Sequence, residues 1–199
     1  MKTTMRAAIL LIGLIMSSIA FASTKLPTQD PMGGQDFGHS VKHIGNGLYV
    51  FRWWVYRNIF VVTDEGVIVT DPMNPKAAKL LQSEIRKVTD KPVKYVVYSH
   101  NHHDHISGGN IFKAEGAKFV GHKNMLNQLS DHPSPVIPMP DITFDDSYTL
   151  TLGGRTLELT YLGPNHGDSL VVMRLRPLKL CLKLRCRYLV FVWGTSCWP

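Results

Sequence analysis

Apolar and polar residues alternate with the short period of β-strands in the first part of the chain. Two such runs, Val41–Ile44 and Leu48–Trp53, flank Gly45–Gly47, which is typical of a tight hairpin turn. A second hairpin is predicted from Asn58–Thr63 and Val67–Thr70. Strands are therefore expected to dominate the start of the fold.

The period changes to that of a helix after Asn74. From Pro75 to about Val88, apolar residues recur at helical spacing, which predicts a helix with one face in the core. Asn74 can cap the first turn, and Pro75 suits that turn. The residues expected on the core face are Ala77, Leu81, Ile85 and Val88.

Strands and helices alternate beyond this helix. Val93–Tyr98 is rich in β-branched and aromatic residues and predicts a buried strand. A helix is expected from about Lys123 to Leu129. Further strands are expected at Lys118–Gly121, Tyr148–Leu152, Thr156–Leu162 and Ser169–Met173.

The strand Val93–Tyr98 is followed by a dense group of potential metal ligands. Ser99–His105 holds four of them within six residues: His100, His102, Asp104 and His105. Several protonated imidazoles so close together would repel one another, whereas neutral imidazole and carboxylate are both zinc ligands. A loop past the carboxyl end of a strand is also where open α/β sheets place their sites. The segment therefore predicts a metal site; the alternative is a surface loop that binds metal incidentally.

The spacing of these ligands indicates their directions. His100 and His102 are two residues apart and should project from the same side of an extended segment. Asp104 and His105 are adjacent, so their side chains should not point the same way from an extended segment. They should therefore face another side of the site or bind a second ion.

The pattern His100-x-His102-x-Asp104-His105 resembles the signature of the metallo-β-lactamase superfamily. Thr70-Asp71, at the end of an apolar strand, resembles the early aspartate of that family, and Gly163–Asp168 resembles the segment with its third histidine ligand. The resemblance extends over about residues 40 to 176. It implies an α/β (α+β) fold, the αβ/βα sandwich, with one or two metal ions in a hydrolytic site.

On this resemblance, His100, His102 and His166 hold the first ion and leave one position open for water. Three protein ligands plus water is the catalytic arrangement of zinc. Asp104 and His105 would begin a second site. The expected cofactor is zinc, as one or two ions, with iron and manganese as alternatives because imidazole and carboxylate serve several metals.

The candidate catalytic residues are Asp104 and Asp71. Asp104 could orient or deprotonate the attacking water, and Asp71 should orient the ligand loop through hydrogen bonds. The implied function is an exported zinc-dependent hydrolase that uses metal-activated water on an ester, an amide such as a β-lactam, or a related bond. Small molecules are the expected substrates.

Other residues receive structural interpretations. Trp53, Trp54 and Tyr56 are expected to pack at the edge of the core, although a hairpin at this place could hold apolar parts of a substrate. His122 is expected to cap the backbone or lie exposed. Asp168 is expected to form a hydrogen bond near His166 or to stabilise the turn.

The first 22 residues have the pattern of a signal peptide. Lys2 and Arg6 precede an apolar run, and Ala20–Ala22 offers a small-x-small cleavage site. A membrane anchor is the alternative, but the apolar run is short for a span. We predict export to the periplasm or medium, no membrane span after cleavage, a linker at 23–40 and a folded domain at 41–176.

The formal charge of +7 does not describe the predicted domain. Residues 23–168 hold 14 basic and 15 acidic side chains, and the positive excess lies in the leader and beyond Ser169. A basic total normally suggests anionic partners, but here the sequence predicts no nucleic-acid binding. Nothing in the sequence indicates an oligomeric state.

Residues 177–199 differ in composition from the rest. They are basic and contain all three cysteines and two of the four tryptophans, and no Asp, Glu or His follows Asp168. On the resemblance, the second site lacks two ligands and the second half of the sandwich is incomplete. A frameshift after about residue 176 is favoured. The alternatives are a native end that docks on a partner or a membrane, and cysteine pairing that leaves one thiol over.

Two hypotheses of different class follow from these observations. The chain is either a zinc hydrolase or an inactive, non-enzymatic metal-binding fragment without the second-site ligands. The loss of half a sandwich is also expected to expose an apolar sheet face.

Overall fold

The computed structural model describes residues 38–176 and 188–190, which lie in one compact unit, Phe37–Pro199. The predicted signal peptide, and most of the predicted linker and basic tail, lie outside the described residues. Within the described ranges, no helix is long and apolar enough to cross a membrane.

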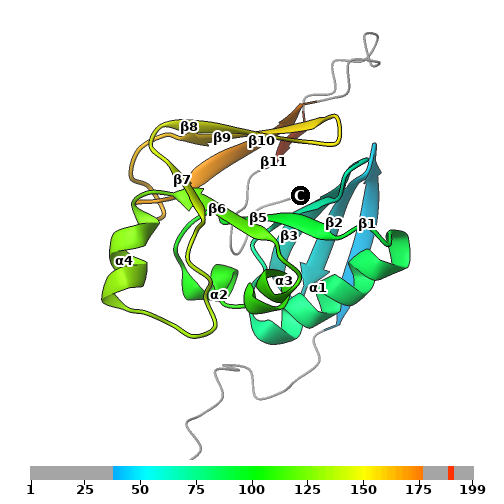
Figure 1. Cartoon of the computed structure of the whole chain (residues 1–199), viewed down its shortest axis with the longest axis horizontal. Helices are drawn as coiled ribbons and strands as arrows, with labels where there is room; N and C mark the ends of the chain where they lie inside the picture. Colours follow the sequence, from blue (N-terminus) through cyan, green and yellow to red (C-terminus); the bar gives the residue numbers. More distant parts are fainter. Residues whose placement is uncertain (1–37, 177–187, 191–199) are drawn as a thin grey trace, which may run out of the picture. The chain divides into compact units, whose positions relative to one another are not determined.

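Seven strands form a mixed sheet in the order β1-β2-β3-β4-β5-β6-β7 (Figure 1). Their bounds are β1 His39–Gly45, β2 Leu48–Trp53, β3 Tyr56–Val62, β4 Val67–Thr70, β5 Val93–Val97, β6 Lys118–His122 and β7 Ile142–Phe144. Strands β1 to β4 pair antiparallel and β4 to β7 pair parallel. The parallel strands therefore bring their carboxyl ends to one edge of the sheet.

Both predicted hairpins at the start of the fold are confirmed. The first turns at Asn46 and Gly47, whose φ angles of 51° and 73° are both positive, as a tight two-residue hairpin turn requires. A Cβ on Gly47 would lie 2.4 Å from the carbonyl oxygen of Val62, so only glycine fits there. Strand β1 starts at His39, inside the predicted linker, and the three-residue β7 was not predicted because it is too short to show a period.

Four strands form the second sheet, in the order β11-β10-β9-β8. Their bounds are β8 Ser147–Leu152, β9 Arg155–Tyr161, β10 Val171–Arg176 and β11 Tyr188–Val190. All neighbours pair antiparallel. Strand β11 belongs to the segment predicted as an atypical tail, and its backbone pairs with Met173–Leu175 of β10.

Four helices cover one face of the seven-stranded sheet: α1 Pro75–Val88, α2 His103–Ile106, α3 Asn110–Ala114 and α4 Met125–Asp131. The predicted bounds and cap of α1 are confirmed, since Asn74 accepts hydrogen bonds from the amides of Lys76 and Ala77. The prediction that Val88 faces the core is wrong. Val88 ends the helix and is 42% exposed, and Ala78 is buried in its place.

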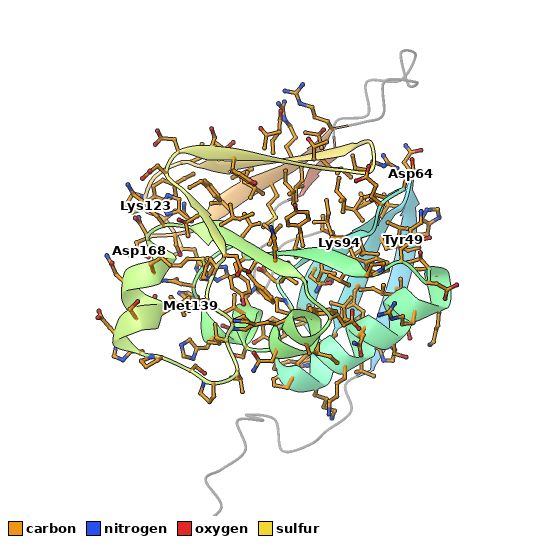
Figure 2. All side chains as sticks on the ribbon, viewed as in Figure 1. Tyr49, Asp64, Lys94, Lys123, Met139 and Asp168 are labelled. Carbon is orange, nitrogen blue, oxygen red and sulfur yellow. The ribbon has the colours of Figure 1, made fainter. Side chains whose placement is uncertain are left out.

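Two apolar cores separate the three layers of the fold, which are the helices, the seven-stranded sheet and the second sheet. One lies between the helices and the seven-stranded sheet and is centred on large side chains such as Phe51, Phe60 and Phe112. The other joins the two sheets and contains Leu157, Leu159 and other residues of both. Side chains fill both spaces (Figure 2). This helix–sheet–sheet order confirms the expected α/β sandwich class for the described part of the fold.

The outer face of the second sheet is polar, contrary to the sequence-based expectation. On β8, β9 and β10 the residues that alternate with the buried ones are Ser147, Thr149, Thr151, Thr156, Glu158, Thr160, Val172, Arg174 and Arg176. Glu158 pairs across the strands with Arg174 and Arg176. The expected exposed apolar face is therefore absent from these three strands, which alternate apolar and polar residues as a sheet with one solvated face does.

Candidate metal centre

The candidate site lies at the carboxyl ends of the parallel strands. Strand β5 runs into the ligand loop through Tyr98, which is fully buried and donates a hydrogen bond to the carbonyl of Pro138 at 2.9 Å. The amide of Tyr98 also donates to the carbonyl of Val120. These bonds fix the start of the loop against β6.

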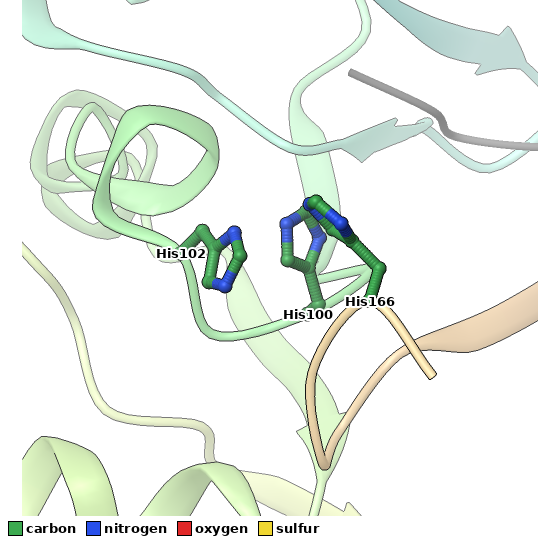
Figure 3. A group of neighbouring side chains, drawn as sticks. All are labelled: His100, His102 and His166. Atoms are coloured by element: carbon green, nitrogen blue, oxygen red, sulfur yellow. The ribbon is translucent and has the colours of Figure 1, made fainter. Parts of the chain in front are cut away.

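Three imidazoles from two loops converge at this edge. His100 and His102 come from the loop after β5, and His166 comes from the loop between β9 and β10 (Figure 3). Each offers one nitrogen, and these nitrogens lie within 4.8 Å of one another. The ring centroids are 4.6 Å apart for His100 and His102, and 4.8 Å apart for His102 and His166. This spacing leaves room for one cation between them.

The hydrogen bonds of His100 determine which of its nitrogens is available. Ser99 Oγ donates to Asp71 Oδ2 at 2.5 Å, so it accepts from His100 Nδ1 at 2.8 Å. Nδ1 then carries the proton and Nε2 keeps its lone pair. His100 Nε2 is buried and has no hydrogen-bond partner among the described residues. A buried acceptor without a partner is costly, and a metal ion would satisfy it.

Asp71 is the buried anchor of the ligand loop. It is fully buried, and its carboxylate accepts from Ser99 N at 2.7 Å, Ser99 Oγ and His105 Nδ1 at 3.2 Å. Its backbone has a φ of 32°, which is strained for a residue with a side chain. Asn58 Nδ2 holds this backbone by donating to the Asp71 carbonyl at 2.8 Å. Asp71 thus acts on the site through hydrogen bonds.

Asp104 and His105 lie beside the three imidazoles. Both belong to α2, where Asp104 is exposed and His105 is buried. The distance from Asp104 Oδ2 to His105 Nε2 is 3.8 Å. The segment is helical rather than extended, so the directions expected for a strand do not apply to this pair. His105 forms a second group of potential ligands with Asp71 and His100. Asp104 belongs to neither group of potential ligands.

Burial and charge set the protonation of these imidazoles. Burial, aided by the neighbouring imidazoles and opposed by Asp71, lowers the pKa of His100 to about 4. Burial also lowers the pKa of His102. For His105, burial opposes protonation, but the hydrogen bond and charge of Asp71 outweigh it and raise the pKa. His100 and His102 are therefore neutral near pH 7, as metal ligands must be.

Tyr56 contacts the site, whereas packing at the edge of the core is the role expected from the sequence and a hairpin near the site only the alternative. Its ring meets His105 edge-on at 5.7 Å, and its phenol lies close enough to Asp104 for that carboxylate to act on it. Burial and the carboxylate of Asp104 raise the pKa of this phenol. Tyr56 also contacts Trp54 at 6.1 Å. The sequence shows an aromatic cluster in a hairpin, and the contact of this hairpin with α2 depends on the tertiary fold.

His122 is buried, so of the two roles expected of it, exposure is excluded and capping is confirmed. Its Nε2 donates to the carbonyl of Asp145 at 2.5 Å, and its Nδ1 accepts from the amide of Asn124 at 3.3 Å. The ring stacks on Tyr161 at 3.9 Å. The capping expectation agrees with the bond to Asn124, and His122 belongs to neither group of potential ligands.

The comparisons with known proteins agree with this geometry. The family model of the metallo-beta-lactamase superfamily matches residues 52–182. The match extends over more than half of the chain, so the chain belongs to this superfamily, which confirms the resemblance seen in the sequence.

Individual relatives show how much of the family's length is present. A type 2 metallo-beta-lactamase of Elizabethkingia meningoseptica is 29% identical over 142 residues, which is 67% of this chain and 56% of the relative. The alpha subunit of the 2,4-dinitroanisole O-demethylase of Nocardioides sp. (strain JS1661) is 28% identical over 121 residues, which is 58% of this chain and 36% of the relative. The chain thus spans between about a third and just over half of these relatives.

A solved structure gives the same fold. The metallo-beta-lactamase from Pontibacter korlensis superposes with a TM-score of 0.62 at 22% identity, over 69% of this chain and 67% of that chain. At this identity the likeness shows the architecture and not the substrate.

Proposed function

We propose that this chain is an exported zinc-dependent hydrolase in which His100, His102 and His166 hold the ion. The observation that carries the proposal is the convergence of three imidazole nitrogens within 4.8 Å. One of them, His100 Nε2, is buried and has no hydrogen-bond partner among the described residues. Three nitrogen ligands leave a zinc ion one open position for water.

When bound there, zinc supplies Lewis-acid chemistry: it lowers the pKa of a bound water to about 7 and polarises a carbonyl. The chain supplies the positioning. The carboxylate of Asp71 fixes Nδ1 of His100 as a donor through Ser99. To Asp104, which is exposed next to His105, we assign the role of orienting the attacking water or accepting its proton. An ester or an amide, including a β-lactam, is the proposed substrate bond.

Metal content and hydrolysis test this proposal together. We expect the purified protein to bind zinc and to hydrolyse at least one of nitrocefin, p-nitrophenyl acetate and p-nitrophenyl sulfate, with loss of activity in EDTA. His166→Ala should weaken zinc binding by about tenfold or more, because even indirect support of a ligand is worth 10- to 100-fold. His103→Ala is the control, since this imidazole next to His102 begins α2, is exposed and belongs to neither ligand group. Equal zinc affinity in the two variants would overturn the proposal.

Export is supported by the leader-like residues 1–22. Mass spectrometry of protein recovered from the periplasm or medium should show an N-terminus at Ser23. Protein that stays in the cytoplasm with residues 1–22 attached would contradict export.

A second candidate is a metal-binding protein without hydrolytic activity. The observation in its favour is that Asp71 and His105, which make the second ligand group with His100, already bond to each other. One bound zinc per chain, with no turnover of the three substrates, would identify this second function.

A further inference from the structure

Asn101 lies between two proposed ligands, but its side chain serves another purpose. It is buried, with 4% exposure, and its Nδ2 donates to Asp168 Oδ1 at 3.2 Å and to Gln128 Oε1 of α4. The Asp168 carboxylate can only accept, so the orientation of the amide is determined by its partner. The bond joins residues 67 positions apart, in the two loops that carry the imidazoles.

Asp168 is held from a second side. Asn124 Nδ2 donates to the backbone carbonyl of Asp168 at 2.6 Å; Figure 2 marks Asp168. The two loops are also in contact, because a Cβ on Gly167 would lie 3.5 Å from Asn101 Oδ1 and 3.9 Å from His102 Nε2. His166 is two residues from Asp168, so these contacts hold the loop close to the residue that carries the third imidazole.

We propose that Asn101 is a positioning residue that fastens the His166 loop to the His100–His102 loop, so that the third imidazole reaches the other two. The inference rests on the metal site of the proposed function. An amide suits this role because it offers two N–H groups to two acceptors. A carboxylate at position 101 would face the carboxylate of Asp168 and push the loops apart.

An exchange of the two partners tests the inference. Asn101→Asp and Asp168→Asn should each weaken Co²⁺ affinity by about 10- to 100-fold, as loss of an indirect support does, and should reduce the visible absorption of four-coordinate cobalt. The double variant N101D/D168N restores an amide–carboxylate pair in reverse and should regain affinity to within a few-fold of wild type. Asn110→Asp is the matched control, because it changes an exposed asparagine that bonds to the carbonyl of Pro135 instead.

Hydrogen exchange of the metal-free protein gives a second readout. In either single variant, amides of residues 163–168 should exchange faster while those of β5 stay unchanged, and the double variant should reverse this. Unchanged cobalt affinity in both single variants, or a double variant no better than either, overturns the inference. If the wild-type protein binds no cobalt, the proposed function fails, and the exchange data alone decide whether Asn101 holds the loop.

Discussion

At the scale of single residues, the carboxylate of Asp71 controls two imidazoles at once. His105 Nδ1 bonds to it directly, and His100 Nδ1 reaches it through the hydroxyl of Ser99. This arrangement leaves Nε2 of His100 as the lone pair that faces the site. Partners that fix the tautomer of a ligand also raise its basicity, so the hydroxyl of Ser99 should matter for metal binding although it touches no ion.

Ser99→Ala should therefore lower zinc affinity by about 10- to 100-fold, measured by competition with a chromogenic chelator. Ser107→Ala is the control, because Ser107 is also buried but its hydroxyl donates to the carbonyl of His103, outside the chain of bonds to Asp71. Equal losses in the two variants would show that the hydroxyl of Ser99 has no special role.

The buried imidazole of His122 should make stability depend on pH. Burial, with a contribution from Lys123 and against the opposing charges of Asp168 and Asp146, lowers the pKa of His122. Below about pH 6.5 the unfolded chain takes up a proton that the folded ring resists. The stabilisation is therefore complete above that pH and is lost as the pH falls.

His122→Gln should lower the free energy of unfolding by about 1–3 kcal/mol at pH 8, because two buried hydrogen bonds lose a partner. The difference from wild type should shrink between pH 7 and pH 5, as followed by urea denaturation of the metal-free protein. His132→Gln, at an exposed position, should change neither the free energy of unfolding at pH 8 nor its dependence on pH. A difference that stays constant with pH would contradict the argument.

At the scale of elements, the close approach of α1 to the turn before α3 positions the ligand loop. A Cβ on Gly108 would lie 2.7 Å from the side chain of Ala78 and equally near the carbonyls of Pro72 and Asn74. The amide of Gly108 donates to the carbonyl of Met73, and the amide of Met73 donates to the carbonyl of His105. Any displacement at Gly108 therefore reaches a residue of the site.

Gly108→Ala should destabilise the fold by about 1–3 kcal/mol, as overpacking of a tight interior does, and should also weaken zinc binding. Gly116→Ala is the comparison: Gly116 has a φ of +87° with no atom within 4 Å of an added Cβ, so only backbone strain of about 1–2 kcal/mol is expected. Denaturant midpoints and zinc titrations of both variants check this. Unchanged zinc affinity in Gly108→Ala would contradict the argument that packing at Gly108 positions the ligand loop.

At the scale of the whole molecule, the two sheets are held together by one apolar layer. Leu159 of β9 is fully buried in it, whereas the next residue, Thr160, is exposed on the outer face. The same strand thus has one face that holds the sandwich together and one that meets water.

Leu159→Ala should cost about 2–5 kcal/mol of stability, because it removes buried contacts and leaves a cavity. Thr160→Ala should stay within about 0.5 kcal/mol, as surface substitutions do. Thermal and denaturant unfolding of the full chain measure both. A large loss in Thr160→Ala would show that the outer face is covered in the folded protein.

Much of the fold could be predicted from the sequence because the signals were local. The hairpin at Asn46 and the cap at Asn74 depend on neighbouring residues only, and both were predicted correctly. Val88 was misplaced because helical spacing does not show where the covering layer ends. The alternation of Thr156, Glu158 and Thr160 with apolar residues in the sequence indicates the polar outer face of the second sheet.

The sequence by itself determined the family, the strand and helix pattern and the identity of the imidazoles, since each follows from residues near one another in the chain. Only the tertiary structure decided that His166 meets His100, that Ser99 links His100 to Asp71, and that Asn101 holds the distant loop. These contacts join segments far apart in sequence. Their geometry depends on how the parallel strands and the second sheet bring loop ends together, which no local pattern records.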